Sequence, residues 1–574
     1  MSSPLSGVPE HFDAIVVGSG FGGSVSAQRL AAAGQRVLVL ERGKPYPPGS
    51  FPRTPVNMKH NFWNPSQGLQ GMFDLWSFDG FDGLVSSGLG GGSLIYANVT
   101  LRKDEHWFVH DDRTGGAYES WPVTRADLDP HYDRVEPMLE VQKYPFDQAP
   151  YNQTGKTITL KEASVGIGEW FLPNLAITFA NPDSLAIPGE PILEARPNLH
   201  RRTRQTCRLC GECDVGCNYG SKNTLDYTYL TAAQYDGAEI RTRCEVRDFA
   251  PLADGRWTVS YVHHDEAAEG RVTDTKALPS TTLTADRLIL SAGTFGTNFL
   301  LLSMRERGVL PGLSPALGQG FSGNGDMLSF ALRCSQTTPD GSQSPRIVDP
   351  STGPVITSAM RMADEHDGNG ASGRGFYVED AGYPAFGSWM VQLLDEPRVL
   401  MESLPLIFKV VRRLLGRRSE DDNSPISELF GDCSRSAGLM PLLAMGRDVP
   451  DGKMSLDGDT LQIDWSKDRG SHGYYKKVRE VCERMTEQAG GEFRDVPTWL
   501  LNRAVTVHPV GGARMGNTAA EGVVDPWGRV FGYPGLHVAD GSVMPGSVGA
   551  NPSLTIAALA DRFCNAIIEG LPEP

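Results

Sequence analysis

The stretch from residue 13 to residue 41 constrains the fold more than any other part of this 574-residue chain. A short apolar run leads into three glycines, spaced Gly18-x-Gly20-x-x-Gly23, and a helical stretch and a second apolar run ending in Glu41 follow. Gly18 allows a tight strand-to-helix turn, Gly20 lets a ligand approach the backbone, and Gly23 lets the helix pack close to the strand. The pattern predicts a β-α-β unit of the dinucleotide-binding type.

The helix that begins in this motif has free backbone N–H groups and the positive end of its dipole at its N-terminus, which suit a pyrophosphate. Glu41 lies 18 residues beyond Gly23, where an acceptor for ribose hydroxyls belongs. A carboxylate there disfavours a 2′-phosphate, so NADP is not expected, whereas the motif alone leaves FAD and NAD open. The predicted cofactor-binding residues of this motif are Gly18, Gly20, Phe21, Gly22, Gly23 and Glu41.

Composition limits the fold and the partners. A chain of this length predicts two or more domains, or one large composite. The net charge of −16 argues against nucleic acid as a partner, because phosphate binding needs a basic surface. The N-terminus lacks the basic and apolar stretches of a secretory signal, and no run of about 18 apolar residues predicts a membrane span. We therefore expect a cytoplasmic protein.

Four of the nine cysteines fall within eleven residues, spaced C-x2-C-x2-C-x3-C. This spacing is typical of bacterial iron–sulfur segments, but Asn218 replaces the usual proline after the fourth cysteine, and the chain has no second run. Cys244 is a candidate for completing the ligand set. Zinc, which prefers two separated cysteine pairs, and reduced structural thiols are the alternatives. The tentative iron–sulfur ligands are Cys207, Cys210, Cys213 and Cys217.

A second glycine-rich loop, Gly90-Gly91-Gly92-Ser93, has apolar flanks. Consecutive glycines allow close backbone approach and can form anion-binding N–H groups, so a packed loop near a cofactor is favoured over a flexible surface loop. Residues 398–418 combine apolar residues with a basic flank, which suits a membrane-surface helix, a lid or a packed helix. Pro405 interrupts any helix there, so peripheral membrane contact is the less favoured interpretation. Strands are expected near 238–243, 257–263 and 287–291.

The C-terminal segment adds residues that suit enzyme chemistry. It contains the motif His508-Pro-Val-Gly-Gly, then Val538-Ala-Asp540-Gly541, and then Gly549-Ala-Asn551-Pro552-Ser553-Leu-Thr. Together with the two glycine-rich segments and the Ser291-Ala-Gly293 strand end, these motifs follow one another in the order found in a known family. The chain resembles the glucose–methanol–choline (GMC) oxidoreductases, most closely their bacterial cholesterol-oxidase-like branch, while residues 315–490 match only weakly.

The resemblance implies FAD rather than NAD as the cofactor. The first motif is then expected to line the pyrophosphate and the adenosine ribose. Many family members carry Asn or His where this chain has Tyr96, with Asn98 two residues further on, so flavin contacts there depart from the family pattern. The other FAD contacts that the resemblance implies are Gly90, Gly91, Gly92, Ser93, Asn98, Val246, Gly293, Asp540, Gly541, Asn551, Pro552 and Ser553.

His508 and Asn551 are the candidate catalytic residues. Oxidation of an alcohol removes a hydride from carbon and a proton from oxygen, and free imidazole, with a pKa near ~6.5, suits that proton transfer. Asn551 is expected to position the substrate oxygen, while the flavin accepts the hydride at N5. His537 lies inside an apolar strand and is expected to be structural.

The expected fold is α/β: a Rossmann-like FAD-binding domain with a second, substrate-binding domain built on a mostly antiparallel β-sheet with helices. The FAD-binding domain is expected in three parts, over 10–110, 236–314 and 501–574. Residues 111–235 are expected to connect the domains and cap the substrate, with the cysteine run at 207–217. The substrate-binding domain is expected over 315–500.

The leading functional expectation is FAD-dependent oxidation of a bulky apolar alcohol, such as a 3β-hydroxysteroid, with O2 as the acceptor. If the cysteines hold a 4Fe–4S or related cluster, a dehydrogenase for a sugar or fatty alcohol that passes electrons to a protein or quinone is the alternative. A flavin and iron–sulfur electron-transfer protein without alcohol chemistry is the alternative from another class. Isomerase activity would need a second acid/base carboxylate, which the sequence does not locate.

Overall fold

The β-α-β unit that the glycine motif predicts forms the start of the structure. The computed structural model describes residues 9–110, 119–385, 437–500 and 502–571. Strand β1 (His11–Val17) pairs in parallel with β2 (Val37–Leu40), and helix α1 (Phe21–Ala32) connects them. All of β2 and most of β1 are buried, as expected for strands of a parallel sheet covered on both faces.

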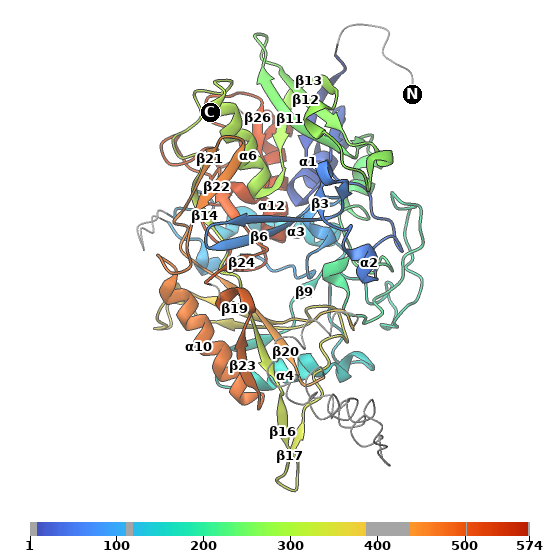
Figure 1. Ribbon diagram of the computed structural model, residues 1–574, viewed down its shortest axis with the longest axis vertical. Helices are drawn as coiled ribbons and strands as arrows, with labels where there is room; N and C mark the ends of the chain where they lie inside the picture. The colour runs from blue at the N-terminus through green and yellow to red at the C-terminus, as the bar shows by residue number, and fades with distance from the viewer. Residues whose placement is uncertain (1–8, 111–118, 386–436, 501, 572–574) are drawn as a thin grey trace, which may run out of the picture.

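Distant parts of the chain complete the sheet around this unit. The strand order is β10-β2-β1-β13-β12-β11, with β26 pairing beside β13. β13 pairs in parallel with β1 and β26, whereas β12 and β11 form an antiparallel extension. The sheet occupies the upper part of the molecule in Figure 1. The added strands are β10 (Glu239–Arg241), β11 (Cys244–Pro251), β12 (Trp257–His263), β13 (Ser280–Leu290) and β26 (Leu536–Val538).

The three strands predicted in this region are present, and one of them is longer than expected. β10 and β12 fall within the predicted ranges, while β13 begins several residues before the predicted 287–291. Its first residues are exposed polar side chains, which have no hydrophobic pattern, and they pair with β12 as a projecting hairpin.

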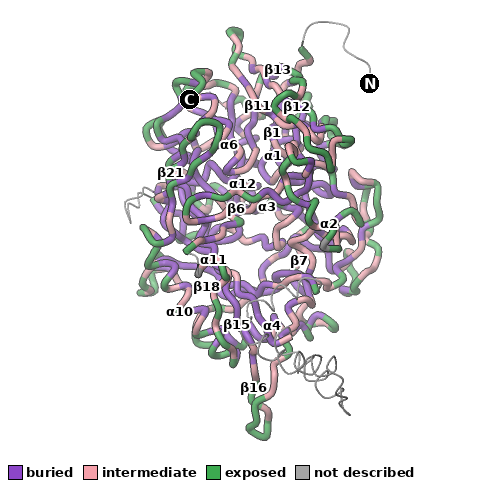
Figure 2. The backbone as a smooth tube through the Cα atoms, in the orientation of Figure 1, coloured by how far each residue is buried: buried purple, intermediate pink, exposed green. Residues whose placement is uncertain are grey.

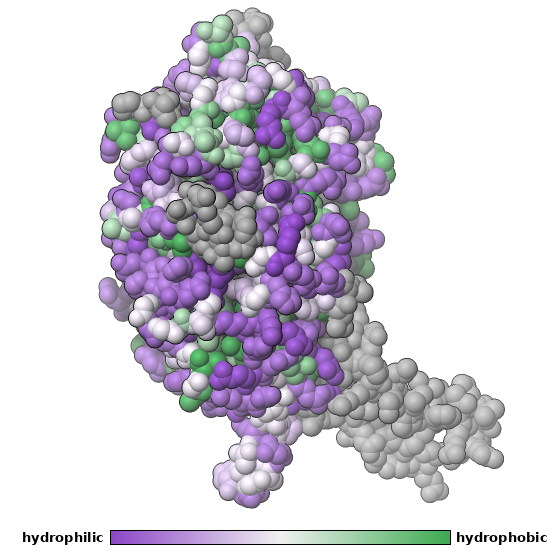
Figure 3. Space-filling model, turned by 90° about the vertical axis from the view of Figure 1, so that its left-hand side faces the viewer, coloured by the Kyte–Doolittle hydropathy of each residue, from purple (hydrophilic) through white to green (hydrophobic). Residues whose placement is uncertain are grey.

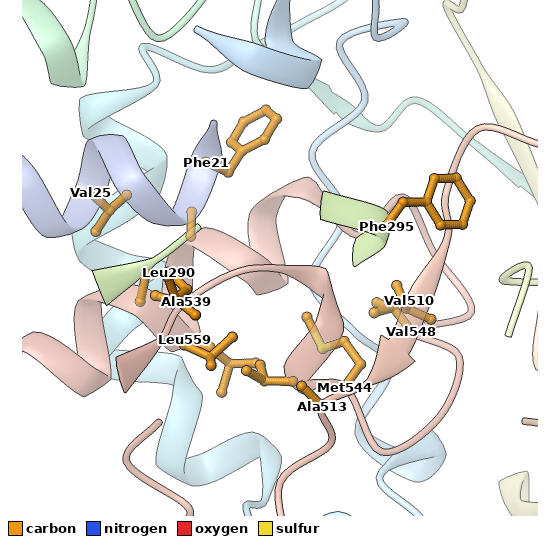
Figure 4. Close-up of a cluster of buried hydrophobic side chains, with 14 of the residues drawn as sticks. Phe21, Val25, Leu290, Phe295, Val510, Ala513, Ala539, Met544, Val548 and Leu559 are labelled. Atoms are coloured by element: carbon orange, nitrogen blue, oxygen red, sulfur yellow. The ribbon is translucent and has the colours of Figure 1, made fainter. Parts of the chain in front are cut away.

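Helices from both ends of the chain pack together beside this sheet. α1 contacts α12 (Ser553–Glu569) and α5 (Tyr229–Tyr235), and α12 also contacts α3 (Arg125–Met138). Another helix, α6 (Gly293–Glu306), begins directly after β13. Figure 4 shows how the start of α1, the end of β13 and the C-terminal segment share buried side chains, among them Phe21, Leu290 and Met544.

The second large sheet is antiparallel throughout, as the sequence predicts for the substrate-binding part. Its strand order is β23-β15-β20-β19-β18-β8, and helices α10 (His472–Gln488) and α4 (Gly155–Ala163) pack against it. It lies in the lower part of Figure 1. Its strands are β8 (Glu169–Phe171), β15 (Met327–Leu332), β18 (Ala359–Met362), β19 (Phe376–Asp380), β20 (Met440–Gly446) and β23 (Glu492–Asp495).

Smaller sheets join the two halves. β5 (Phe73–Phe78), β6 (Phe81–Ser86) and β24 (Ala504–Thr506) form one sheet. A second runs β22-β21-β14-β25 and consists of β14 (Gln319–Ser322), β21 (Gly452–Asp457), β22 (Thr460–Asp464) and β25 (Val510–Gly512). One buried hydrophobic cluster includes residues of both large sheets, so the halves share a core, and buried backbone runs through both in Figure 2.

Polar residues dominate the described part of the face in Figure 3, where hydrophobic residues form small separate groups. Within the described residues, no helix is long and apolar enough to cross a membrane. The amphipathic stretch at 398–418 lies outside the described residues, so its predicted membrane contact stays a prediction.

Candidate active site

The two glycine loops of the N-terminal part lie against each other. The 3-10 helix η2 (Gly91–Leu94) contacts α1, and a Cβ added at Gly91 would lie only 2.7 Å from Cα of Gly20. Gly91 also has a φ of +52°, so a glycine is needed at this position. Ser19 joins the loops further, because its Oγ accepts a hydrogen bond from the N–H of Gly90 at 3.0 Å.

The N-terminus of α1 is open to a ligand. Its N-cap, Gly20, has an extended backbone, and the fully described helix has neither a side-chain cap nor an acidic residue in its first turn. A Cβ built on Gly20 would meet no atom within 4 Å. Unpaired N–H groups and the positive dipole end therefore face open space, which is the arrangement that binds a pyrophosphate.

Glu41 lies at the end of β2, close to this helix start. It is buried, and its carboxylate accepts hydrogen bonds from the N–H groups of Ser19 at 3.0 Å and Gly43 at 2.8 Å. The N–H of Cys244 bonds to the Glu41 carbonyl at 2.8 Å, so the start of β11 lies beside it. Val246 lies two residues further along that strand, and its contact with adenine stays a prediction.

Asp540 joins the C-terminal segment to the end of β13. It is the N-cap of the 3-10 helix η12 (Gly541–Val543), and its carboxylate accepts from the N–H groups of Ser542 at 2.9 Å and Gly293 at 3.0 Å. Thr297 Oγ1 donates to the same carboxylate at 2.5 Å. Burial raises the pKa of Asp540, although these hydrogen bonds act in the opposite direction. The carboxylate is thus used to hold α6 and η12 side by side.

The imidazole of His508 is oriented by a buried carboxylate. His508 lies between β24 and β25, and its Nδ1 is 2.8 Å from Oδ1 of Asp326. The other Asp326 oxygen accepts from the N–H groups of Val507 at 2.8 Å and His508 at 3.1 Å. The Asp326 side chain is 3% exposed and that of His508 is 15% exposed. Among the described residues, Nε2 of His508 makes no hydrogen bond, which leaves it for a ligand.

Asn551 faces a second buried carboxyl group, that of Glu379 at the end of β19. Asn551 Nδ2 lies 3.5 Å from Oε2 of Glu379, while Asn551 Oδ1 and Glu379 Oε1 have no hydrogen-bond partner among the described residues. Burial raises the pKa of Glu379 to about 8, and the charges of Asp380 and Asp326 add to the rise. The two pairs lie near each other, because Asn324, two residues before Asp326, hydrogen-bonds the carbonyl of Ala550, the residue before Asn551.

One turn between β14 and β15 positions both catalytic candidates. Asn324 donates from Nδ2 to the Ala550 carbonyl at 3.0 Å and accepts from the N–H of Gly549 at 3.0 Å, which fixes the segment before Asn551. Asp326, two residues later, holds His508. The structure therefore brings together residues separated by more than 200 positions in the sequence.

Two family models match this chain. A GMC oxidoreductase model matches residues 450–560, and an NAD(P)-binding Rossmann-like domain model matches residues 16–49. Cholesterol oxidase of Mycobacterium tuberculosis is 31% identical, with 96% of this chain and 90% of that protein covered. The chain belongs to the GMC oxidoreductase family. It is an FAD-dependent enzyme that oxidises alcohols, as the sequence motifs predict.

Other relatives agree with this assignment. Cholesterol oxidase of Acinetobacter baumannii is 28% identical, with 97% of this chain and 94% of that protein covered. A long-chain-alcohol oxidase of Arabidopsis thaliana is 25% identical and is covered over 67% of its length. The crystal structure of pyridoxine 4-oxidase from Mesorbium loti shares the fold, with a TM-score of 0.54 and 17% identity over 96% of this chain and 98% of that one.

The residues of this GMC oxidoreductase fit an FAD. The open N-terminus of α1 suits the pyrophosphate, and the touching glycine loops leave backbone rather than side chains along the path of the cofactor. Asn98 is fully buried with a φ of +72°, yet neither polar atom of its side chain has a hydrogen-bond partner in the part of the chain that the structure describes. Such unpaired buried groups suit a polar ligand. Pro552 and Ser553 begin α12, where Ser553 Oγ lies 3.5 Å from the Val99 carbonyl, so they lie near Asn98.

Asp326 and Glu379 are the site residues that sequence reasoning missed. Both lie in the middle region that resembles the family only weakly, and neither belongs to a glycine motif. Two signals were present in the sequence: Asp326 follows the turn-forming stretch Gly323-Asn324-Gly325, and the Glu379-Asp380 pair ends an apolar run. Neither signal shows that Asp326 contacts His508 or that Glu379 contacts Asn551, because those contacts depend on how distant segments of the chain pack together.

The four cysteines of the predicted iron–sulfur segment line one small cavity. Cys244, the remote candidate, lies instead on β11 beside Glu41. His537 is buried on β26, and burial lowers its pKa to about 4, which agrees with the structural role expected for it.

Proposed function

We propose that this enzyme oxidises the hydroxyl group of a bulky apolar alcohol to a carbonyl, with a 3β-hydroxysteroid as the leading substrate class and O2 as the electron acceptor. The observation that carries the proposal is the His508–Asp326 pair beside the Asn551–Glu379 pair. The relatives named as cholesterol oxidases and a long-chain-alcohol oxidase support an apolar alcohol.

His508 is the proposed base. Because Asp326 accepts the Nδ1 proton, the neutral imidazole carries its lone pair on Nε2, which takes the proton of the substrate hydroxyl. Bound FAD supplies the acceptor for the hydride. The unpaired side-chain oxygen of Asn551 is available to fix the hydroxyl before proton transfer, and Asp326 then stabilises the imidazolium that forms.

Glu379 gives the site a second proton carrier. A buried carboxyl group whose pKa is about 8 is protonated over most of the neutral range and can both give and take a proton. Some substrates would give a ketone whose carbon–carbon double bond lies between the β- and γ-carbons. In its ionised form, Glu379 can remove a proton from the α-carbon of this ketone and return the proton to the γ-carbon. The product would be the conjugated enone, with no change in oxidation state.

The substrate class is tested by mixing the FAD-loaded enzyme with alcohols in the absence of oxygen. A 3β-hydroxysteroid is expected to bleach the flavin absorbance fastest, a long-chain primary alcohol more slowly and a sugar least. Readmission of O2 should restore the absorbance and form hydrogen peroxide. Faster bleaching by the sugar would contradict the substrate class, and an unreactive flavin with every alcohol would favour an electron-transfer protein.

A further inference from the structure

The four clustered cysteines line a cavity whose lining does not include His508, Asp326, Asn551 or Glu379. Cys207, Cys210, Cys213 and Cys217 all line it, together with Lys222. None of the four forms a disulfide with another described cysteine, and Cys207 and Lys222 are almost fully buried. Neither alcohol oxidation by His508 nor reoxidation of the flavin by O2 requires these thiols, so a metal group here would be additional to the proposed function. We propose that this cavity binds an iron–sulfur cluster of the 4Fe–4S class, with the four cysteines as its ligands.

The spacing of the sulfur atoms argues against a single metal ion. Zinc bound by four thiolates has Zn–S distances of about 2.3 Å, so its sulfur atoms lie roughly 4 Å apart. Among the described residues, the only three potential ligands whose atoms all lie within 4.8 Å of one another are Asp364, Glu365 and His366. No three of the four sulfur atoms therefore lie within 4.8 Å of one another, a spacing wider than that of four thiolates on one zinc ion and suited to a multinuclear cluster.

The backbone around the cavity turns sharply. Leu209, Gly211 and Gly216 have φ values of +59°, +64° and +86°, and such turns let several cysteines of a short segment face one space.

Other parts of the chain hold the cysteine loop in place. Arg53 donates to the Glu212 carboxylate at 2.7 Å and to the Gly216 carbonyl at 2.5 Å. Gly211 and Gly353 are joined by a backbone hydrogen bond of 2.8 Å. The loop is therefore braced by contacts from two other regions of the chain, which would keep the four thiols together before a cluster assembles.

The cavity lies directly behind the glycine loop of the FAD site. Lys222 donates from Nζ to the carbonyls of Leu94 at 3.0 Å and Cys213 at 2.8 Å, and Leu94 is the last residue of η2. The short helix η6 (Cys213–Val215) also contacts η2. The hydrogen-bonded groups of Leu94, Lys222 and Cys213 would thus lie between a cluster in this cavity and the FAD site.

The test is the metal content of the FAD-loaded, full-length protein purified without oxygen. About four irons and as many acid-labile sulfides per chain are expected, with an electron paramagnetic resonance signal after reduction by dithionite. Cys210→Ala should lose the iron and the signal while keeping one FAD per chain. Cys334→Ala is the matched control, because Cys334 is a buried free thiol outside the cavity, and it should keep both.

The iron and sulfide content of the wild-type protein tests the proposal even if the Cys210→Ala variant fails to fold. Iron-free protein, both as purified and after anaerobic treatment with ferrous iron and sulfide, would overturn the proposal, as would one zinc per chain. The outcome is independent of the alcohol chemistry, because dithionite rather than an alcohol reduces the cluster. Loss of alcohol-dependent flavin bleaching would count against the proposed function and leave this result unaffected.

Discussion

Two buried carboxyl groups give the two proposed catalytic side chains different tasks. Asp326 accepts three N–H hydrogen bonds around His508, including the one from the ring, and thereby fixes the direction in which Nε2 points. Among the described residues, Asn551 is the one hydrogen-bond donor to the Glu379 carboxyl group, at 3.5 Å. Burial raises the pKa of Glu379 to about 8, so the group stays protonated at neutral pH. At the residue scale, Asp326 orients and Glu379 exchanges protons.

Asp326→Asn should slow alcohol-dependent flavin reduction by about 10²-fold or more, because an amide does not hold the imidazole in the required tautomer. FAD content should stay unchanged, and Asp326→Glu should restore part of the rate. Stopped-flow absorbance over a range of pH measures this. A variant with the wild-type rate and the wild-type pH profile would show that Asp326 has no positioning role.

Glu379→Gln should keep flavin reduction but lose the double-bond shift of an unsaturated steroid product. Glutamine cannot carry the proton between carbons, whereas His508 is untouched. In the wild type, the shift should become faster as pH rises through about 8, because Glu379 must be ionised to remove a proton. Product analysis by ultraviolet absorbance separates the two ketones, and a conjugated product from the variant would refute the assignment.

FAD affinity is expected to depend on the N-terminus of α1. Gly20→Ala should leave the melting temperature of the FAD-free protein unchanged, since the added methyl meets no protein atom. The same methyl would occupy the space proposed for the pyrophosphate, so FAD affinity should fall at least about tenfold. Gly473→Ala, at an open position in the first turn of α10, is the matched control. Equal FAD affinity in both variants would contradict the proposed path of the cofactor.

The packing of α12 against α1 and α3 depends on the carboxylate of Asp561. Although burial alone would raise its pKa, hydrogen bonds from His131 and Arg134 and the charge of Arg29 lower the pKa of Asp561 to about 2. The group is thus more acidic in the folded chain than in the unfolded chain, and its stabilisation is present above pH 4 and lost as pH falls towards 2.

Asp561→Asn should therefore lower the free energy of unfolding by about 2 kcal/mol at pH 7. The difference from wild type should be as large at pH 5 and should shrink below pH 4. Urea unfolding followed by circular dichroism measures it. A difference that does not change down to pH 3 would show that lost packing, rather than lost charge, destabilises the variant.

At the scale of the whole molecule, elements formed by residues close together in the sequence could be predicted, whereas contacts between residues far apart in the sequence could not. The spacing from Gly18 to Glu41 encodes contacts within one β-α-β unit, so β1, α1 and β2 form where the sequence predicts them. Asp326 and Glu379 act only because β15 and β19 are brought beside a C-terminal segment more than 170 residues further along the chain. The periodicity of a single sequence does not show which distant residues come into contact. The middle region resembles the family only weakly, so the resemblance did not identify Asp326 or Glu379 either.

The most direct test of the account compares anaerobic flavin reduction in the wild type, in His508→Ala and in His472→Ala, with the same 3β-hydroxysteroid. His472 lies exposed at the start of α10 and serves as the control. The account predicts that His508→Ala binds FAD normally but reduces it at least about 10²-fold more slowly, while His472→Ala matches the wild type. Wild-type reduction by His508→Ala would contradict the assignment of His508 as the base.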